Sequence, residues 1–265
     1  IASCLVGSEM CIRDRYYHYI DRKIYAYKFR KACQNADRII AVSECTKRDI
    51  ISFFHIPEEK IDVVYQGCDA QFKQAVPENT KEEIRRKYQL PQRYILYLGS
   101  IESRKNLLLI AKALLHIQEP ITVIAIGKRT PYAETVEDFL RKNHLENRMR
   151  LLSNIPFKEL PAFYQMATTF VYPSFFEGFG IPLLEALNSG VPAIGATGSC
   201  LEEAGGPHSI YIHPEDDKGL AKAIEQTLTD QSLRERMIKE GKKYALLFEE
   251  EKLTKDLLNV YRKTI

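Results

Sequence analysis

The strongest constraint on the fold is a regular alternation of apolar runs and helical stretches that begins near residue 94. Apolar runs that alternate with helices are typical of parallel sheets covered on both faces. The runs lie at Tyr94–Leu98, Ile121–Ile126, Met149–Leu152, Thr169–Tyr172, Val191–Ile194 and Ile210–Ile212. The sequence therefore predicts an α/β fold with a Rossmann-like parallel sheet, whose ligands bind at the carboxyl ends of the strands.

One of these runs is followed by two glutamates that flank a glycine-rich turn, Glu177-Gly178-Phe179-Gly180-Ile181-Pro182-Leu183-Leu184-Glu185. Pro182 suits the start of a helix, and Gly190 predicts its end. A helix N-terminus offers unpaired N–H groups and a positive dipole end, which suit phosphate or sugar hydroxyls. Because carboxylates do not bind phosphate, Glu177 and Glu185 are expected to bind hydroxyls or a developing cation. A sugar with a phosphate leaving group offers both.

The segment Glu177–Glu185 resembles the E-x7-E signature of retaining GT-B glycosyltransferases, in particular those of family 4. Other motifs follow in the order of that family: Tyr97–Leu107 is similar to its phosphate-binding loop, Val123–Lys128 to its second strand and turn, Tyr172-Pro173-Ser174 to the segment before the first glutamate, and Gly198–Gly206 to the loop after the next strand. The resemblance covers residues 16–265. It implies two Rossmann-like domains that face a cleft, with the C-terminal one binding a nucleotide-sugar.

The resemblance also implies a domain layout. Residues 1–15 resemble translated sequencing adapter and are predicted to be non-native, 16–72 form the C-terminal part of the acceptor-side domain, 73–91 a linker with a short helix, 92–247 the nucleotide-sugar-binding domain, and 248–265 a helix that crosses back to the first domain. Because 16–72 is roughly half the length of a typical domain, we interpret the chain as N-terminally truncated, with a remnant of the second Rossmann-like domain.

Shorter elements are expected before residue 92. Helical spacing favours a helix over Tyr16–Gln34, and the apolar runs Arg38–Val42 and Ile61–Tyr65 favour strands. Ser43 is a suitable cap for a helix over Glu44–Phe54.

The family's functional residues can be carried onto this sequence. Arg104 and Lys105 would neutralise the donor diphosphate, and Glu177 would contact sugar hydroxyls near the anomeric carbon, so these three are the candidate catalytic residues. The family more often has an arginine directly after the glycine, where this chain has Ser100, and Arg104 is its candidate replacement. A solvated basic turn and a loop carboxylate are the alternatives.

Glu185 would accept hydrogen bonds from ribose hydroxyls, and its alternative is a first-turn glutamate that stabilises the helix dipole. The other donor-binding candidates follow predicted strands and are Gly99, Ser100, Gly127, Lys128, Ile155, Gly178, Phe179, Gly180 and Ile181. Glu203 resembles a glutamate in a later loop of the family, and helix capping is an equally good interpretation. His208 and His213 are expected at the surface.

Composition and missing patterns exclude other classes. The net charge of +3 is too small to indicate a nucleic-acid partner, and the six cysteines show no metal-binding spacing. No Asp-x-Asp, the pair with which GT-A glycosyltransferases bind a divalent metal, follows a strand, so a metal-free mechanism is expected. The nucleotide-sugar is expected as substrate, without a cofactor. The absence of a Gly-x-Gly-x-x-Gly after a strand argues against a nicotinamide-dependent dehydrogenase. A sugar epimerase or a phosphorylase of the same fold is a further alternative.

The implied reaction is transfer of a hexosyl unit from a nucleoside-diphosphate sugar to a glycan or lipid-linked acceptor, with retention of anomeric configuration, in cell-surface polysaccharide synthesis. The alternative is a nucleotide-sugar-binding fragment or module without catalysis. A cytoplasmic location is expected. The basic helix Arg22–Lys31 is compatible with peripheral contact with the inner membrane surface and with an ordinary solvated face.

Overall fold

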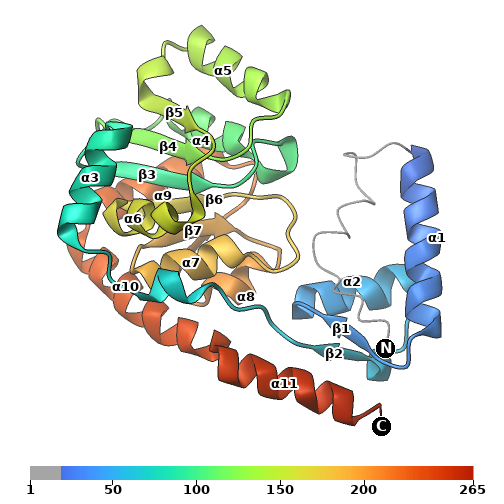
Figure 1. Cartoon of the computed structure of the whole chain (residues 1–265). Coiled ribbons are helices and arrows are strands. Elements are labelled where there is room, and N and C mark those ends of the chain that lie inside the picture. Colours follow the sequence, from blue (N-terminus) through green and yellow to red (C-terminus); the bar gives the residue numbers. More distant parts are fainter. Residues whose placement is uncertain (1–18, 265) are drawn as a thin grey trace.

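The computed structural model describes residues 19–264 and contains two parallel sheets (Figure 1). The predicted non-native segment 1–15 lies outside the described residues. A two-stranded sheet belongs to residues 19–63, which we call the two-stranded part, and a six-stranded sheet belongs to residues 78–245, which we call the six-stranded part.

The two-stranded part is a strand–helix–strand unit with a preceding helix. Its elements are α1 (Tyr19–Asn35), β1 (Ile39–Ala41), α2 (Glu44–Phe54) and β2 (Ile61–Val63). As predicted, Ser43 caps α2, because its side chain accepts the N–H of Thr46 at 3.0 Å. A small core of buried side chains from α1, α2 and both strands, including Phe29 and Ile50, holds the unit together.

The six-stranded sheet has the order β5-β4-β3-β6-β7-β8, and every neighbouring pair is parallel. Its strands are β3 (Tyr94–Leu98), β4 (Thr122–Ile126), β5 (Met149–Leu152), β6 (Thr169–Tyr172), β7 (Ala193–Ala196) and β8 (Ile210–Ile212). These bounds confirm the predicted alternation, and β6 is buried along its whole length, as continuous apolar runs indicate.

The predicted bounds of β7, Val191–Ile194, are wrong by two residues. The Val191 N–H donates to the Ala186 carbonyl at 3.0 Å, so Val191 still belongs to the end of the preceding helix. Pro192 has no N–H for a ladder. Regular pairing therefore begins only at Ala193.

Helices cover both faces of this sheet (Figure 1). The helix α4 (Leu107–Ala113) contacts α5 (Tyr132–Lys142) and α9 (Asp217–Thr229). The opposite group is α3 (Glu78–Tyr88), α6 (Leu160–Met166), α7 (Ile181–Ser189), α8 (Leu201–Gly205) and α10 (Gln231–Ala245). The strand order reverses between β3 and β6, so the loops after these strands leave in opposite directions at the carboxyl edge. In open α/β sheets this switch point is where the ligand crevice lies.

The last helix, α11 (Glu250–Arg262), runs from the six-stranded part to the two-stranded part (Figure 1). Its Val260 packs against Ile40 and Val64, and Lys263 beyond its end forms an ion pair with Asp62 at 2.6 Å. The helix α11 therefore packs against the β1–β2 sheet. Its packing is incomplete, because a cavity of about 390 Å³ remains between α11 and the β1–β2 sheet. Among the residues from 19 to 264, no helix is both long and apolar enough to cross a bilayer.

Candidate active site

The loops after β3 and β6 are joined by backbone and amide hydrogen bonds at the point where the strand order reverses. The Phe175 N–H donates to the Arg104 carbonyl at 3.0 Å. The buried amide of Asn106 donates to the carbonyls of Pro173 at 3.0 Å and Pro214 at 2.8 Å. Asn106 has a φ of 60°, a left-handed conformation that asparagine tolerates better than most residues. These bonds fix the walls of the crevice relative to each other.

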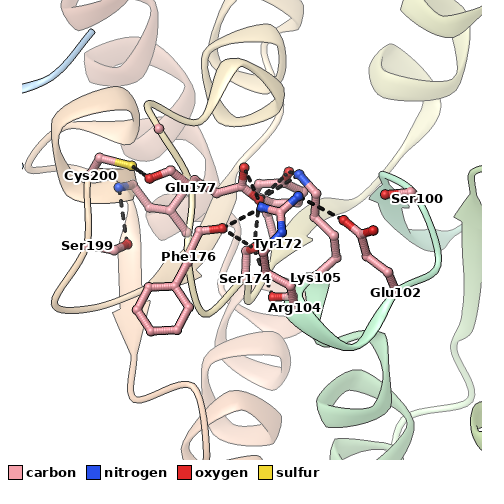
Figure 2. A network of polar contacts seen from close by, with 12 residues as sticks. Ser100, Glu102, Arg104, Lys105, Tyr172, Ser174, Phe176, Glu177, Ser199 and Cys200 are labelled. Carbon is pink, nitrogen blue, oxygen red and sulfur yellow. Dashed lines mark hydrogen bonds and ion pairs between the residues drawn. The ribbon is translucent and has the colours of Figure 1, made fainter. Parts of the chain in front are cut away.

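The Glu177 carboxylate is the centre of the polar network in this crevice (Figure 2). Its Oε1 accepts from Lys105 Nζ at 2.6 Å, Tyr172 OH at 2.9 Å and Ser174 Oγ at 2.7 Å. Lys105 Nζ also donates to the Tyr172 hydroxyl. The predicted catalytic residues Glu177 and Lys105 are therefore in direct contact.

Arg104 completes the network and lies in the short 3-10 turn Ser103–Lys105 before α4. Its Nη1 lies 3.3 Å from Glu177 Oε2 and donates to the Phe176 carbonyl at 2.7 Å. Its Nη2 donates to Glu102 at 2.8 Å. Arg104 thus bridges two carboxylates. Ser100 lies outside the Glu177 network (Figure 2).

Charge pairing decides the protonation of Glu177. Burial raises the pKa of its carboxyl, but the charges of Lys105 and Arg104 and the hydrogen bonds from Lys105 and Ser174 outweigh burial, so the pKa is lowered overall. Burial and the neighbouring Glu177 charge raise the pKa of Tyr172, so its hydroxyl keeps its proton and donates. Glu177 is therefore a fixed anion, which suits it to stabilise positive charge better than to abstract protons.

The N-terminus of α7 faces the same crevice from the loop after β6. Gly180 precedes α7 with a φ of 112°, and a Cβ there would lie 2.7 Å from Leu201 Cδ2, so glycine is required. Pro182 is the second helical residue, and Gly190 ends the helix with a φ of 73°, as predicted. Within the described part of the chain, the N–H groups of Phe179, Gly180 and Ile181 have no hydrogen-bond acceptor. They are available to a ligand.

Glu185 lies one turn further along α7 and makes no contact with the Glu177 carboxylate among the described residues. Its side chain is buried, and Tyr164 OH donates to its Oε2 at 2.8 Å. Burial raises the pKa of Glu185 to about 7, against the opposing effect of the Tyr164 hydrogen bond. Burial also raises the pKa of Tyr164, so its hydroxyl stays a donor.

This buried carboxyl predicts a pH-dependent stability that Glu185→Gln removes. The unfolded pKa lies near 4.5 and the folded one near 7, so the folded state retains a proton that the unfolded state releases between these values. The stability of the wild type therefore falls as pH rises through this window, by about 3 kcal/mol in total. In urea unfolding, the free energy of unfolding of Glu185→Gln relative to that of the wild type should be higher at pH 8 than at pH 5. An equal difference at both pH values would contradict the assignment.

The loops after β3 and β4, which contain Gly99 and Gly127, meet at the carboxyl edge of the sheet. A Cβ on Gly127 would lie 1.8 Å from the Gly99 carbonyl oxygen, so only glycine fits at this crossing. Ser153 Oγ donates to the Gly127 carbonyl at 2.8 Å and joins the loop after β5 to them. Lys128 is exposed and Ile155 is half-buried against the core, and the structure shows no contact between either side chain and the Glu177 network within residues 19–264.

Several site residues have no individual prediction from the sequence. Tyr172 and Ser174 belong to a segment that the family resemblance singles out, but their bonds to Glu177 are visible only in the structure. Tyr164 comes from α6, and no sequence signal links it to Glu185. The Glu203 carboxylate accepts the N–H groups of Glu44 and Cys45 at the start of α2. Glu203 thus caps a helix, which the sequence offered as the alternative to a role in the family's loop. His208 and His213 are exposed, as expected.

Comparison with known proteins identifies the family that the sequence motifs resemble. The family model described as "Glycosyl transferases group 1" matches residues 80–244, and that described as "Glycosyltransferase Family 4" matches residues 12–72. The chain is 33% identical to the O-antigen chain mannosyltransferase B of Escherichia coli over 93% of this chain and 66% of that protein. It is 26% identical to the O-antigen chain mannosyltransferase RfbU of Salmonella typhimurium over 80% of this chain and 58% of that protein.

A solved structure supports the fold. Anabaena Alr3699/HepE, crystallised with UDP and glucose, has a TM-score of 0.83 and 17% identity, with coverage of 91% of this chain and 67% of that one. The chain therefore spans about two thirds or less of the two mannosyltransferases and carries the GT-B fold. From its motifs, fold and family match, the chain belongs to the glycosyl transferases group 1 family.

Proposed function

We propose that this chain supplies the donor site of a retaining glycosyltransferase that transfers a hexosyl unit from a nucleoside-diphosphate sugar. The observation that carries the proposal is the contact of Lys105 and Arg104 with the Glu177 carboxylate, beside the N-terminus of α7, at the point where the strand order reverses. Two cations and a helix N-terminus suit a diphosphate, and a fixed anion suits a developing sugar cation.

In this proposal the diphosphate lies between the two cations and the N–H groups of Phe179, Gly180 and Ile181. Lys105 and Arg104 stabilise the negative charge that grows on the leaving group. Glu177 keeps both cations in place before the donor arrives, because all three groups are already in contact. Glu185 accepts hydrogen bonds from the ribose hydroxyls.

The transfer follows from this placement. The bond between the anomeric carbon and the β-phosphate oxygen breaks, and its electron pair goes to the phosphate. The oxocarbenium-like centre is stabilised by the Glu177 carboxylate. The acceptor hydroxyl attacks from the face that the phosphate leaves and gives its proton to the phosphate oxygen, which retains the anomeric configuration.

The sugar we propose is mannose, and the product is a cell-surface polysaccharide. This proposal is supported by two relatives named above, which are O-antigen chain mannosyltransferases. The acceptor in this proposal is the growing glycan or its lipid-linked carrier.

A donor-turnover assay tests the proposal. The purified chain is incubated with GDP-mannose, UDP-mannose, ADP-mannose, CDP-mannose and UDP-glucose. Release of the nucleoside diphosphate is followed with water or a mannosyl glycan as acceptor. We expect release from one mannose donor. Binding of that donor without release would favour the alternative, a nucleotide-sugar-binding module. The absence of binding by a folded chain would refute both.

A further inference from the structure

We infer that α2 of the two-stranded part holds the donor loop Gly178–Gly180 in its binding geometry, with Ser43, Thr46 and Glu203 as positioning residues. This inference rests on the proposed function and deepens it. It assigns a role in donor binding to a helix that lies far from the donor loop in the sequence.

Two hydroxyls from α2 hold one carbonyl of the donor loop. Ser43 Oγ lies 2.8 Å and Thr46 Oγ1 lies 3.1 Å from the Gly178 carbonyl oxygen. Both side chains are buried, with 0% and 2% exposure. The two hydroxyl oxygens also lie 2.9 Å from each other, so the two hydroxyls and the Gly178 carbonyl form one hydrogen-bonded cluster. The loop between Glu177 and Gly180 is therefore fixed from outside the six-stranded part.

Fixing this carbonyl also fixes the direction of a hydrogen-bond donor of the site, the Phe179 N–H. The peptide between Gly178 and Phe179 is planar, and no cis peptide bond occurs from residue 19 to residue 264. In a trans peptide the N–H points away from the C=O, so fixing the Gly178 oxygen fixes the direction of the Phe179 N–H. That N–H is one of the unpaired groups that the proposed function assigns to the donor.

A carboxylate from the six-stranded part makes the reverse contact. Glu203 Oε2 accepts the N–H of Glu44 and Glu203 Oε1 accepts the N–H of Cys45, both at 2.7 Å. These are two of the N–H groups that the first turn of α2 leaves without helical partners, and the carboxylate also complements the helix dipole. Glu203 lies on α8, which packs against α7.

An aromatic contact adds to these hydrogen bonds between the two-stranded and six-stranded parts, and we call this set of contacts the joint. The Tyr65 ring, just after β2, lies 5.6 Å from the Phe179 ring and 5.5 Å from the Phe248 ring. Phe179 is buried and Phe248 precedes the crossing helix α11. The donor loop is thus held by hydroxyls, by ring packing and, through α8, by a charged cap. Its geometry depends on the docking of α2, so loosening this joint should weaken donor binding without a change in any group that touches the donor.

The variants Thr46→Val and Glu203→Gln test the inference in the full chain. The matched control is Glu225→Gln, because Glu225 accepts the N–H of Gln118 at 3.1 Å within the six-stranded part, away from α2. Amide hydrogen exchange without ligand measures how firmly the contacts of the joint hold. Titration with the nucleoside diphosphate that the wild type binds measures the affinity of the donor site. Thr46→Ser keeps the hydroxyl and should restore wild-type behaviour.

We expect Glu203→Gln to accelerate exchange at Glu44 and Cys45, and Thr46→Val to accelerate exchange at Leu183, whose N–H donates to Gly180. Both should weaken nucleotide affinity about tenfold, the size of one or two lost hydrogen bonds. Exchange in β3 and β4 should stay unchanged, which separates this effect from general unfolding.

The other outcomes are distinguishable. Unchanged exchange at these amides would overturn the joint itself. Faster exchange with unchanged affinity would overturn the positioning role and leave the proposed function intact. If the wild type binds no nucleotide, the proposed function fails, and the positioning of the loop by α2 is then decided by exchange at Leu183 in Thr46→Val, with wild-type exchange overturning it.

Discussion

Lys105→Met should lower the rate of sugar transfer by about 10²–10³-fold, the usual cost of removing one charge-stabilising donor from an active site. Methionine keeps much of the length of the lysine side chain and loses its charge. Lys105 Nζ lies 2.6 Å from Glu177 Oε1, and both side chains are mostly buried. The variant therefore loses a cation that stabilises the leaving diphosphate. It also leaves the Glu177 carboxylate with Arg104 as its nearest cation.

The second consequence is a loss of stability. Removing one partner of a buried ion pair typically costs about 3–5 kcal/mol, because the remaining charge is buried and less well compensated. Arg104 stays within 3.3 Å of Glu177, so the loss should fall at the lower end of that range. The pKa of Glu177 should rise, since the Lys105 charge is the first of the causes that lower it.

Initial rates of nucleoside diphosphate release measure the first effect, and urea unfolding at pH 7 measures the second. Lys239→Met is the matched control, because Lys239 is exposed on α10, and it should keep the wild-type rate and stability. Lys105→Arg, which retains the charge, should recover part of the rate. A Lys105→Met variant that turns over donor within about threefold of the wild type would contradict the assigned role.

Glu185→Ala should abolish the stabilisation of the chain by its nucleotide. The Glu185 carboxylate is buried, and its only hydrogen-bond donor among the described side chains is Tyr164. At pH 8, above its pKa of about 7, Glu185 is charged and one of its oxygens is available to ribose hydroxyls. Hydrogen bonds to a charged group are among the stronger ones in proteins, at about 1.5–3 kcal/mol each. Losing two such bonds is expected to weaken binding by 10²-fold or more.

Calorimetric titration of the wild type and Glu185→Ala with the same nucleoside diphosphate measures this loss. The alanine variant leaves the buried Tyr164 hydroxyl without its acceptor, so Glu185→Ala/Tyr164→Phe serves as a second variant that removes both groups. Glu225→Ala, which removes a half-buried carboxylate of the six-stranded part, should bind like the wild type. Wild-type affinity in both Glu185 variants would rule out a role of Glu185 in nucleotide binding.

The elements of the six-stranded part were predictable because their apolar periodicity is strong. The runs Tyr94–Leu98 and Thr169–Tyr172 are strands with the predicted bounds, since their side chains are buried on both faces of the sheet. The error at β7 arose where Gly190 and Val191 close the preceding helix with hydrogen bonds that an apolar run does not reveal. Local hydrogen bonding decided that boundary.

The site was predictable only in part, for a different reason. Motif order placed Lys105 and Glu177 in one crevice, and the structure places them in contact. The motif gave no sign that Glu185 would be paired with Tyr164, because that contact depends on how α6 packs against α7. The bonds from Ser43 and Thr46 to Gly178 join segments more than a hundred positions apart. Such contacts follow from tertiary packing and leave no local signal.

The most direct test of the donor site is thermal unfolding of the wild type and Glu185→Ala with UDP, GDP, ADP and CMP, followed by the corresponding nucleotide-sugars. At about 100 times the Kd, a nucleotide that binds only the folded chain adds ~2.7 kcal/mol of stability. We expect one nucleotide to raise the melting temperature of the wild type and to leave that of Glu185→Ala unchanged. A folded wild type that no nucleotide stabilises, or an equal rise in Glu185→Ala, would contradict a nucleotide-sugar site between β3, β6 and α7.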